Sequence, residues 1–389
     1  MSLLVVASFL YRPAVQRSER YRALVVPLAN IMDVGFIVLA PVIVVLVGFD
    51  APFFMLGICL AAIAAGFAIS YNIRHYEPLI GTEDSLHSLA RWAQWALLGA
   101  SVINIGYYAM LLMSLILLPF EIYSEDRVTI TAALLLIAVI VIGYRRGLDG
   151  LNRLGNRTTA FNLSAIFAIL VAFFVFNVQE MLGGRWDLPD YNPPTDPDAL
   201  RKLLGLFAMV QGFEAARYVG SRFSAEVRVS TMRWAQGIST VVFVSLLASV
   251  LILFVQVRPE PDATAIFVVS DAVSPVLPFI ILLAAIGSQM SAVVNATSSR
   301  SDLLVEATSG TLEKRYTFPI LLVPAVVVVV LTDVTAAVAL ASRVFAGFFV
   351  LQAIIAARLS WRARSTSHVV GFTLVGLLMS TIMIFGLPV

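Results

Sequence analysis

Long apolar runs separated by short polar segments repeat along almost the whole chain. A helix needs roughly 20 mostly apolar residues to cross a bilayer, and by that measure the pattern predicts about eleven spanning helices. The ninth and tenth are separated by the polar turn "TDVT". The pattern therefore predicts an all-α integral membrane protein with spans near residues 24–48, 52–72, 88–118, 128–144, 160–178, 203–221, 234–256, 272–298, 317–331, 335–357 and 367–387.

The composition supports this class and excludes others. Of the 389 residues, 60% are hydrophobic and 13% are charged, whereas a soluble domain carries about 25% charged residues. The net charge of +2 is too small to indicate a nucleic-acid partner. Cys59 is the single cysteine, which excludes an internal disulfide and a cysteine-based metal site.

The basic residues predict the orientation in the membrane. With the amino terminus inside, most of the 26 Lys and Arg residues fall in short cytoplasmic segments, as the positive-inside rule requires. We therefore expect a multi-pass protein of the plasma (inner) membrane, with a cytoplasmic amino terminus and an external carboxyl terminus. The apolar stretch of the amino-terminal segment precedes its basic stretch, the reverse of a signal peptide, so we expect this segment to be retained.

A Pro-rich external loop, residues 179–202, divides the first ten spans into two sets of five. An odd number of spans in each set requires the second set to insert upside down, which is the pattern of an inverted repeat. The first and sixth spans are both interrupted by Gly and polar residues, and the third and eighth are both unusually long. The predicted organisation is a cytoplasmic segment (1–23), repeat 1 (24–178), the loop, repeat 2 (203–358), and a cytoplasmic loop with an eleventh span (359–389).

Polar residues interrupt the first and sixth spans near the centre of the bilayer. The first span contains Asn30 and Asp33 followed by Gly35, and the sixth contains "QGFE", with Gln211, Gly212 and Glu214. A charged side chain at that depth costs about 2.5–3.5 kcal/mol on insertion scales, so a position facing lipid is disfavoured. Broken helices also direct free amides and carbonyls at the gap. The pattern therefore predicts a substrate site at the midplane.

Two readings stay open for the charged residues in these spans. Glu214 and Arg217 are three residues apart, so they either neutralise one another on one helix face or contact the substrate or a coupling ion. Asp33 has no basic neighbour in sequence. It therefore either binds an ion or proton or makes a buried structural hydrogen bond.

The eighth span contains hydroxyl and amide residues in "GSQMSAVVNATSSR". Ser288 and Ser291 are three residues apart, and Gln289 and Asn295 add further oxygens. Such oxygens suit a hard cation such as Na⁺, but small hydroxyl residues also allow close packing of helices in lipid.

Other polar residues are candidates for contacts with the solute or for gates. Asn104, Tyr107 and Tyr108 lie near the centre of the third span, where they either contact the substrate or pack in the core with satisfied hydroxyls. Arg343 lies near the external end of the tenth span. It either closes an external gate through an acidic partner or packs against the external loop.

Three segments resemble the amino acid–polyamine–organocation (APC) superfamily, whose members share the LeuT-type five-plus-five inverted repeat. These are "VQGFEAARYVGSRFSAEVRVSTMRWAQGIS" around the sixth span, "NATSSRSDLLVEATSGTLEKRYTFP" after the eighth, and "VALASRVFAGFFVLQAIIAARL" in the tenth. The first span, "NIMDVGFIVLAP", is bulkier and more acidic than the usual Gly-rich run of that family. The fifth lacks the lysine that some proton-coupled members carry.

The resemblance implies alternating access around the first and sixth spans. It implies a substrate site that includes Phe213, an aromatic residue that would act as a gate. It also implies a cation site near Ser288 and Ser291, between the first and eighth spans. The other residues it assigns to the substrate site are Asn30, Asp33, Gly35, Gln211, Gly212 and Glu214.

The leading hypothesis is a secondary active transporter of a small polar solute, an amino acid or related amine, driven by H⁺ or Na⁺ with Asp33 as the first coupling residue. We expect no cofactor other than a coupling ion, Na⁺ or H⁺. The expected partners are the solute and the bilayer, with no nucleic acid, and the oligomeric state stays open. The alternatives are an inorganic cation or metal transporter on the same fold, for which Met32 would supply a thioether, and a non-transporting sensor. Because no HExxH, GxSxG or Walker A motif occurs, we predict neither catalytic residues nor enzyme activity.

Overall fold

The computed structural model describes residues 17–33, 35–120, 123–187, 196–253 and 265–389, apart from the side chains of residues 39 and 149–160. Within these ranges every regular element is a helix. The first half of the chain contains α3 (Glu19–Ile31), α4 (Gly35–Val47), η1 (Gly48–Asp50), α5 (Ala51–His75), η2 (Glu77–Leu79), α6 (Leu86–Leu117), α7 (Glu125–Arg146) and α8 (Asp149–Leu182).

The second half begins with three short helices and continues with long ones. The elements are α9 (Pro197–Gly205), η3 (Phe207–Val210), η4 (Phe213–Val219), α10 (Ala225–Leu251), α12 (Ala265–Val273), α13 (Leu277–Ala307), α14 (Lys314–Leu331), α15 (Val334–Arg362) and α16 (Thr366–Phe385).

Ten segments of the described chain are long and apolar enough to span a bilayer, compared with about eleven predicted. The predicted sixth span, 203–221, is divided among α9, η3 and η4, each too short to span alone. The chain is an all-helical membrane protein.

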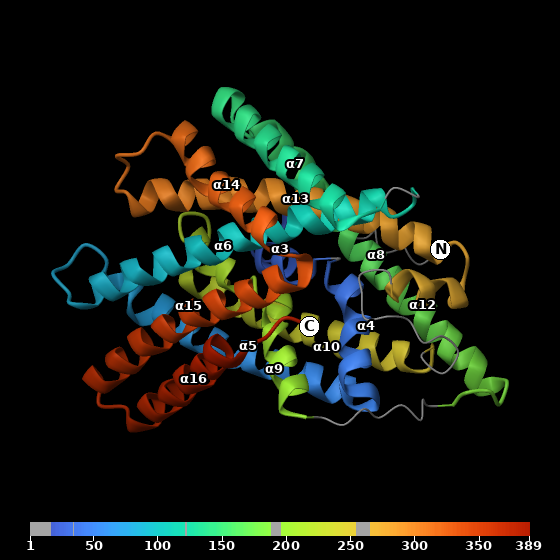
Figure 1. Ribbon diagram of the computed structural model, residues 1–389. Helices are drawn as coiled ribbons and strands as arrows, with labels where there is room; N and C mark the ends of the chain where they lie inside the picture. Colours follow the sequence, from blue (N-terminus) through green and yellow to red (C-terminus); the bar gives the residue numbers. More distant parts are fainter. Residues whose placement is uncertain (1–16, 34, 121–122, 188–195, 254–264) are drawn as a thin grey trace.

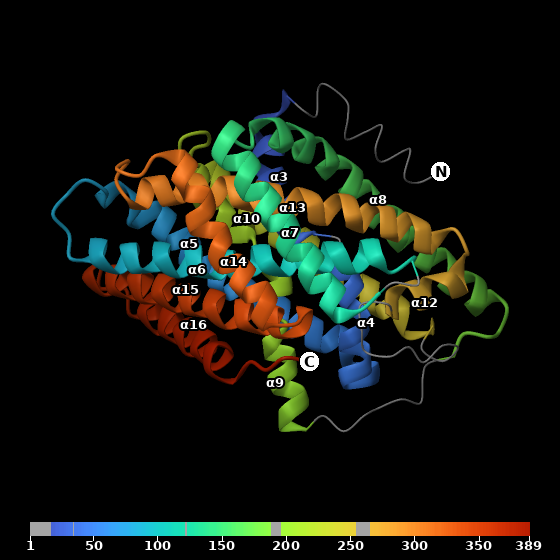
Figure 2. The same cartoon turned by 45° about the horizontal axis from the view of Figure 1, so that its top comes forward.

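The two helices predicted to be unusually long form the centre of the structure. They are α6, with 32 residues, and α13, with 31, and they pack against each other. The helix α3 packs chiefly against α10 and η4, and Figure 1 shows it projected between α6 and α13. Figure 2 shows α6 and α13 side by side. In the most apolar stretch of α6, 83% of the residues are buried, compared with 17% in α16. Thus α6 lies in the core, and α16 leaves most of its surface for lipid.

Several boundaries differ from the sequence-based ones. The helix α8 continues to Leu182, and α9 already begins at Pro197, because Asp196 caps it by accepting a hydrogen bond from the Ala199 amide at 2.7 Å. The predicted loop 179–202 is therefore partly helical. The predicted eighth span, 272–298, begins later and extends to Ala307, because a turn at 274–276 separates α12 from α13.

The segment after α16 packs against α9. The amide of Leu387 donates a hydrogen bond to the carbonyl of Arg201 at 2.9 Å. A Cβ added to Gly205, at the end of α9, would overlap the carbonyl of Leu387. The first part of the broken sixth span, α9, is therefore held by main-chain contacts with the segment that follows α16.

Candidate substrate site

The first span is interrupted between α3 and α4. The last amide of α3 to bond within the helix is that of Met32, which donates to the carbonyl of Leu28 at 2.8 Å. Met32 then leaves helical geometry (φ −91°, ψ 56°), Asp33 is not helical, and α4 begins at Gly35. Asp33 therefore lies at the break, between the carboxyl end of one helix and the amino end of the next.

The sixth span is interrupted between η3 and η4. Gln211 is extended (φ −83°, ψ 173°), and Gly212 follows in the left-handed region with φ +117°. This value of φ favours glycine over any residue with a Cβ. The amide of Gly212 donates to Oε2 of Glu214 at 2.8 Å, so the carboxylate satisfies a main-chain donor that the break leaves free.

The two interruptions contact each other. A Cβ added to Gly212 would lie 2.7 Å from the carbonyl carbon and 2.8 Å from the oxygen of Asn30. Contacts under 3.0 Å are forbidden for a Cβ unless the neighbour moves, and here the neighbour is main chain. A glycine at position 212 thus lets the broken parts of the two halves of the chain approach closely.

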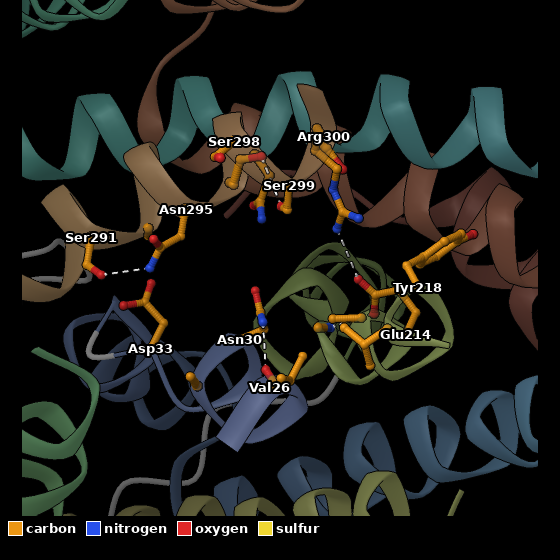
Figure 3. A pocket seen from close by; sticks show the side chains of 18 of the residues that line it. Val26, Asn30, Asp33, Glu214, Tyr218, Ser291, Asn295, Ser298, Ser299 and Arg300 are labelled. Carbon is orange, nitrogen blue, oxygen red and sulfur yellow. Dashed lines mark hydrogen bonds and ion pairs between the residues drawn. The ribbon is translucent and has the colours of Figure 1, made fainter. Parts of the chain in front are cut away.

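A cavity of about 640 Å³ lies beside this contact. Its deep part is lined by Asn30, Asp33, Asn104, Tyr108, Gln211 and Ser288. It extends to Ser221 and Arg222 after η4, and to Glu306 and Lys314 near the loop that joins α13 to α14. Figure 3 shows these walls, with Asn30 and Asp33 on one side and α13 on the other. A solute of moderate size fits this volume.

At the deep end, Asp33 accepts hydrogen bonds from two residues of α13. The Ser288 hydroxyl donates to Oδ1, and Nε2 of Gln289 lies 3.0 and 2.9 Å from the two carboxylate oxygens. The side chain of Gln289 is buried. Asp33 thus joins the broken first span to the eighth through donors that stabilise its negative charge.

Towards the outer part of the cavity, Glu214 faces Arg300 of α13 (Figure 3). Oε1 of Glu214 lies 3.7 Å from Nη2 of Arg300, and the side chains are 1% and 12% exposed. This separation is too long for a hydrogen bond. The pair nevertheless brings opposite charges together where either charge alone would be costly.

The comparisons with known proteins identify the family. A family model described as "APC superfamily transporter" matches residues 13–386. An uncharacterized protein of Aquifex aeolicus (strain VF5) is 31% identical over 396 residues, which cover 99% of this chain and 95% of that protein. The chain belongs to the APC superfamily of transporters.

Solved structures of transporters share the fold of this APC superfamily member. The substrate-bound, outward-open state of a Na⁺-coupled sialic acid symporter matches with a TM-score of 0.53 and 15% identity, over 99% of this chain and 94% of the symporter. A mutant of the manganese transporter of Eremococcus coleocola matches with a TM-score of 0.52 and 14% identity, over 94% of this chain and 87% of that one. The LeuT-type fold predicted from the sequence is thus confirmed, and the chain is a transporter rather than an enzyme.

Most of the predicted site residues of this APC transporter line the cavity. They come from both interrupted spans, α6 and α13, and their roles in binding or coupling stay predictions. Asn104 donates to the hydroxyl of Tyr108 at 2.8 Å, and Asn295 donates to the hydroxyl of Ser291 at 3.0 Å. The predicted residues in the lining are Asn30, Asp33, Asn104, Tyr108, Gln211, Gly212, Glu214, Ser288 and Ser291.

Other predicted residues lie next to the cavity rather than in its wall. Phe213 is fully buried and stacks on Phe349 with ring centroids 5.2 Å apart. Gly35 begins α4 and packs against the amide of Gln289. Tyr107 lines a separate space of about 30 Å³ beyond the break. The proposed gate at Phe213 stays a prediction, because here its ring packs in the core.

The ion pair expected as one reading of Glu214 and Arg217 does not form, because each side chain has another partner. Arg217 instead donates to Oε1 of Gln352 on α15, and its guanidinium carbon lies 5.6 Å from the ring centroid of Tyr76. The reason is that Arg300 supplies the charge partner of Glu214 from another helix.

Arg343 contacts main-chain carbonyls rather than the acidic partner that one of the two readings expected. Its Nε donates to the carbonyl of Met383 at 2.9 Å, at the end of α16. Within the described part of the chain, no acidic side chain forms an ion pair with Arg343 in this structure. Carbonyls at the carboxyl end of a helix attract a cation, which explains the contact. An external gating role for Arg343 stays a prediction.

Sequence reasoning missed Arg300 as a residue of the cavity. It belongs to "NATSSR", the start of the resembling segment after the eighth span, but nothing in its local spacing indicates that it faces Glu214. Gln289 was expected to offer an oxygen, whereas its amide nitrogen makes the contact with Asp33.

Proposed function

We propose that this secondary transporter carries a small polar solute, an amino acid or related amine, coupled to H⁺ or Na⁺. Alternating access takes place around the touching interruptions of the first and sixth spans. The observation that carries the proposal is the contact of Gly212 with Asn30 beside a cavity of about 640 Å³. A site of this kind, between discontinuous helices, suits a solute that both halves of a transporter hold.

The shape of the cavity supports an inward-open state. Its lining extends from Asp33 to Glu306 and Lys314, the side where the positive-inside rule puts the cytoplasm. Beyond the break the free space falls to about 30 Å³, between residues such as Phe36, Met209 and Val338. In the proposed orientation, the solute would leave towards the cytoplasm from this state.

Asp33 is the proposed coupling residue. Its carboxylate joins the interruption of the first span to α13. Protonation of the carboxylate, or a cation bound to it, would change which hydrogen bonds it can accept. Coupling through this position would link the ion to the relative movement of the two walls.

A metal ion is less well supported as the solute. Over the described residues, no group of three or more His, Cys, Asp or Glu side chains could hold a metal ion. Asp33 and Glu214 line the cavity at different places and contact different residues.

Uptake into proteoliposomes tests the proposal. The purified chain is reconstituted, and labelled amino acids and amines are offered under an imposed pH gradient or Na⁺ gradient. We expect at least one solute to accumulate under one gradient, and the accumulation to stop when that gradient is collapsed. Equal uptake by protein-free liposomes for every solute would contradict the proposal.

A further inference from the structure

Arg300 lies in the cavity wall and carries hydrogen-bond donors that no described residue uses. A guanidinium has five N–H donors in a planar fork. Nη2 lies 3.7 Å from Glu214, and Nε is buried without a hydrogen-bond partner among the described residues. Buried polar groups are normally paired, so unpaired donors in a cavity wall need a physical reason.

Glu214 does not use these donors. Its Oε2 accepts from the amide of Gly212 at 2.8 Å, and its Oε1 has no hydrogen-bond partner in the described structure. Glu214 therefore balances the charge of Arg300 while leaving the fork of the guanidinium open. Figure 3 shows the two side chains facing each other from η4 and α13.

Among the described residues, none of the other acidic groups of the cavity wall, Asp33, Asp302 and Glu306, forms an ion pair with Arg300. Asp302 is paired with Lys314 at 2.7 Å. Asp33 is bonded to Ser288 and Gln289, which precede Arg300 by about three turns of α13, or roughly 16 Å along its axis.

The wall between Arg300 and Asp33 is polar and neutral. It carries hydroxyl and amide groups of Asn30, Ser291, Asn295, Ser298 and Ser299 (Figure 3). Such groups bind the polar part of a solute without selecting its charge. Arg300 is the cation next to this neutral stretch. The other basic residues of the lining are Arg222, where the cavity extends beyond η4, and Lys314, which is paired with Asp302.

We propose that Arg300 binds a carboxylate of the solute and makes this transporter prefer carboxylate-bearing solutes over amines. The proposal rests on the proposed function and narrows its substrate class. A carboxylate matches the guanidinium fork with two parallel hydrogen bonds, which an ammonium or a metal cation cannot accept. Glu214 stays on the amide of Gly212 and repels the incoming carboxylate, so its charge limits the affinity.

Thermal-shift and titration measurements on the purified full chain test this assignment. The probes are matched pairs that differ in the carboxylate: L-lysine and cadaverine, L-phenylalanine and phenethylamine, D-gluconate and D-glucitol. We expect the carboxylate member of at least one pair to raise the melting temperature, and its partner to have no effect. Binding of amines alone, or of no carboxylate at all, would overturn the proposal.

Variants separate a binding role from a structural one. Arg300→Gln is expected to weaken carboxylate binding by about 10- to 100-fold, and Arg300→Lys to restore part of it. The matched control is Arg315→Gln, an exposed arginine paired with Glu313 outside the cavity, which should bind as the wild type does. An unchanged Kd in Arg300→Gln would refute the assignment.

A double variant covers the case in which Arg300→Gln fails to fold. Glu214→Gln with Arg300→Gln removes both charges together, so no buried charge is left uncompensated. If Arg300 binds the solute, the double variant folds but still lacks carboxylate binding. If Arg300 only balances Glu214, the double variant binds carboxylates normally.

The assays also separate this proposal from the transport proposal. A carboxylate that binds through Arg300 but is not taken up by proteoliposomes would contradict transport and leave the site intact. Gradient-driven uptake of an amine that Arg300→Gln does not affect would leave transport intact and remove the role of Arg300.

Discussion

The interrupted spans contact α13 differently at the two ends of the cavity. At the deep end, Asp33 accepts hydrogen bonds from Ser288 and Gln289. At the outer end, Glu214 and Arg300 meet at 3.7 Å and form no hydrogen bond with each other. Both contacts connect an interrupted span to α13. The difference shows that side-chain donors of the protein satisfy the carboxylate at the deep end, whereas the guanidinium at the outer end keeps donors without a hydrogen-bond partner among the described residues.

This difference suggests separate tasks for the two ends. A carboxylate with matched donors responds strongly to a change in its own charge, which suits coupling to an ion. A guanidinium with open donors responds to an arriving anion, which suits recognition of the solute. The variants below test this division, beginning with the contact on which both ends depend.

The largest effect is expected for Gly212→Ala, because Gly212 holds the two interruptions together. Alanine at φ +117° is strained by about 1–2 kcal/mol, and its Cβ would collide with the main chain of Asn30. We expect a loss of at least about 100-fold in uptake, since small displacements of a binding site have effects of that size. Gly237→Ala is the control, because a Cβ there meets nothing within 4 Å. Normal uptake by Gly212→Ala would mean that close approach is unnecessary.

Asp33→Asn tests the deep end and should abolish coupling. The new amide nitrogen would face Nε2 of Gln289, so a donor would meet a donor where a carboxylate now accepts. We expect normal expression, and uptake that no longer rises with the pH or Na⁺ gradient. Asp271→Asn, on the exposed surface of α12, is the matched control. Wild-type uptake by Asp33→Asn over the whole pH and Na⁺ range would remove Asp33 from the mechanism.

Glu214→Gln tests the outer end and should have a smaller effect of opposite sign. The amide oxygen of glutamine can still accept from Gly212, while the negative charge beside Arg300 disappears. We expect carboxylate binding to become tighter by about threefold, the size of a modest charge–charge term. Titration of D-gluconate or L-phenylalanine measures it, with Glu313→Gln as the control. Weaker binding would show that Glu214 itself holds the solute.

The smallest effect is expected for an ion pair outside the cavity. Arg362 donates to Asp84 at 2.7 Å and lowers the pKa of Asp84 below its usual value. A lowered pKa in the folded state means that ionised Asp84 stabilises the fold above its unfolded pKa and loses this effect as the pH falls through the folded one. Asp84→Asn should therefore lower the melting temperature slightly at pH 7, and the difference should vanish in acid. Uptake should stay unchanged, in contrast to the variants of the cavity.

The spans and both interruptions could be predicted because they depend on local sequence. Apolar length identifies a membrane helix, and "NIMDVG" and "QGFE" put polar residues and glycine where a continuous helix in lipid would be costly. The left-handed Gly212 and the non-helical Asp33 agree with this reading. The resemblance to the APC superfamily added the arrangement of the helices, which local pattern does not contain.

The partners of the charged residues could not be predicted in the same way. Glu214 and Arg217 are close in sequence, which favours a local pair, but tertiary packing offers Arg300 to one and Gln352 to the other. For Gln289, the residue type allows either a donor or an acceptor. The carboxylate of Asp33 selects the donor, and their meeting depends on how α13 packs beside the interruption.

The hydrogen bond between Leu387 and Arg201 has a mechanical consequence. If α9 tilts when the external side opens, either the eleventh span tilts with it or this bond breaks, because main-chain atoms at both ends cannot compensate by changing rotamer. Spin labels on α9 and α16 would then keep a constant separation in the first case and move apart in the second. The eleventh span, α16, would thus restrict the tilt of α9, the first part of the sixth span.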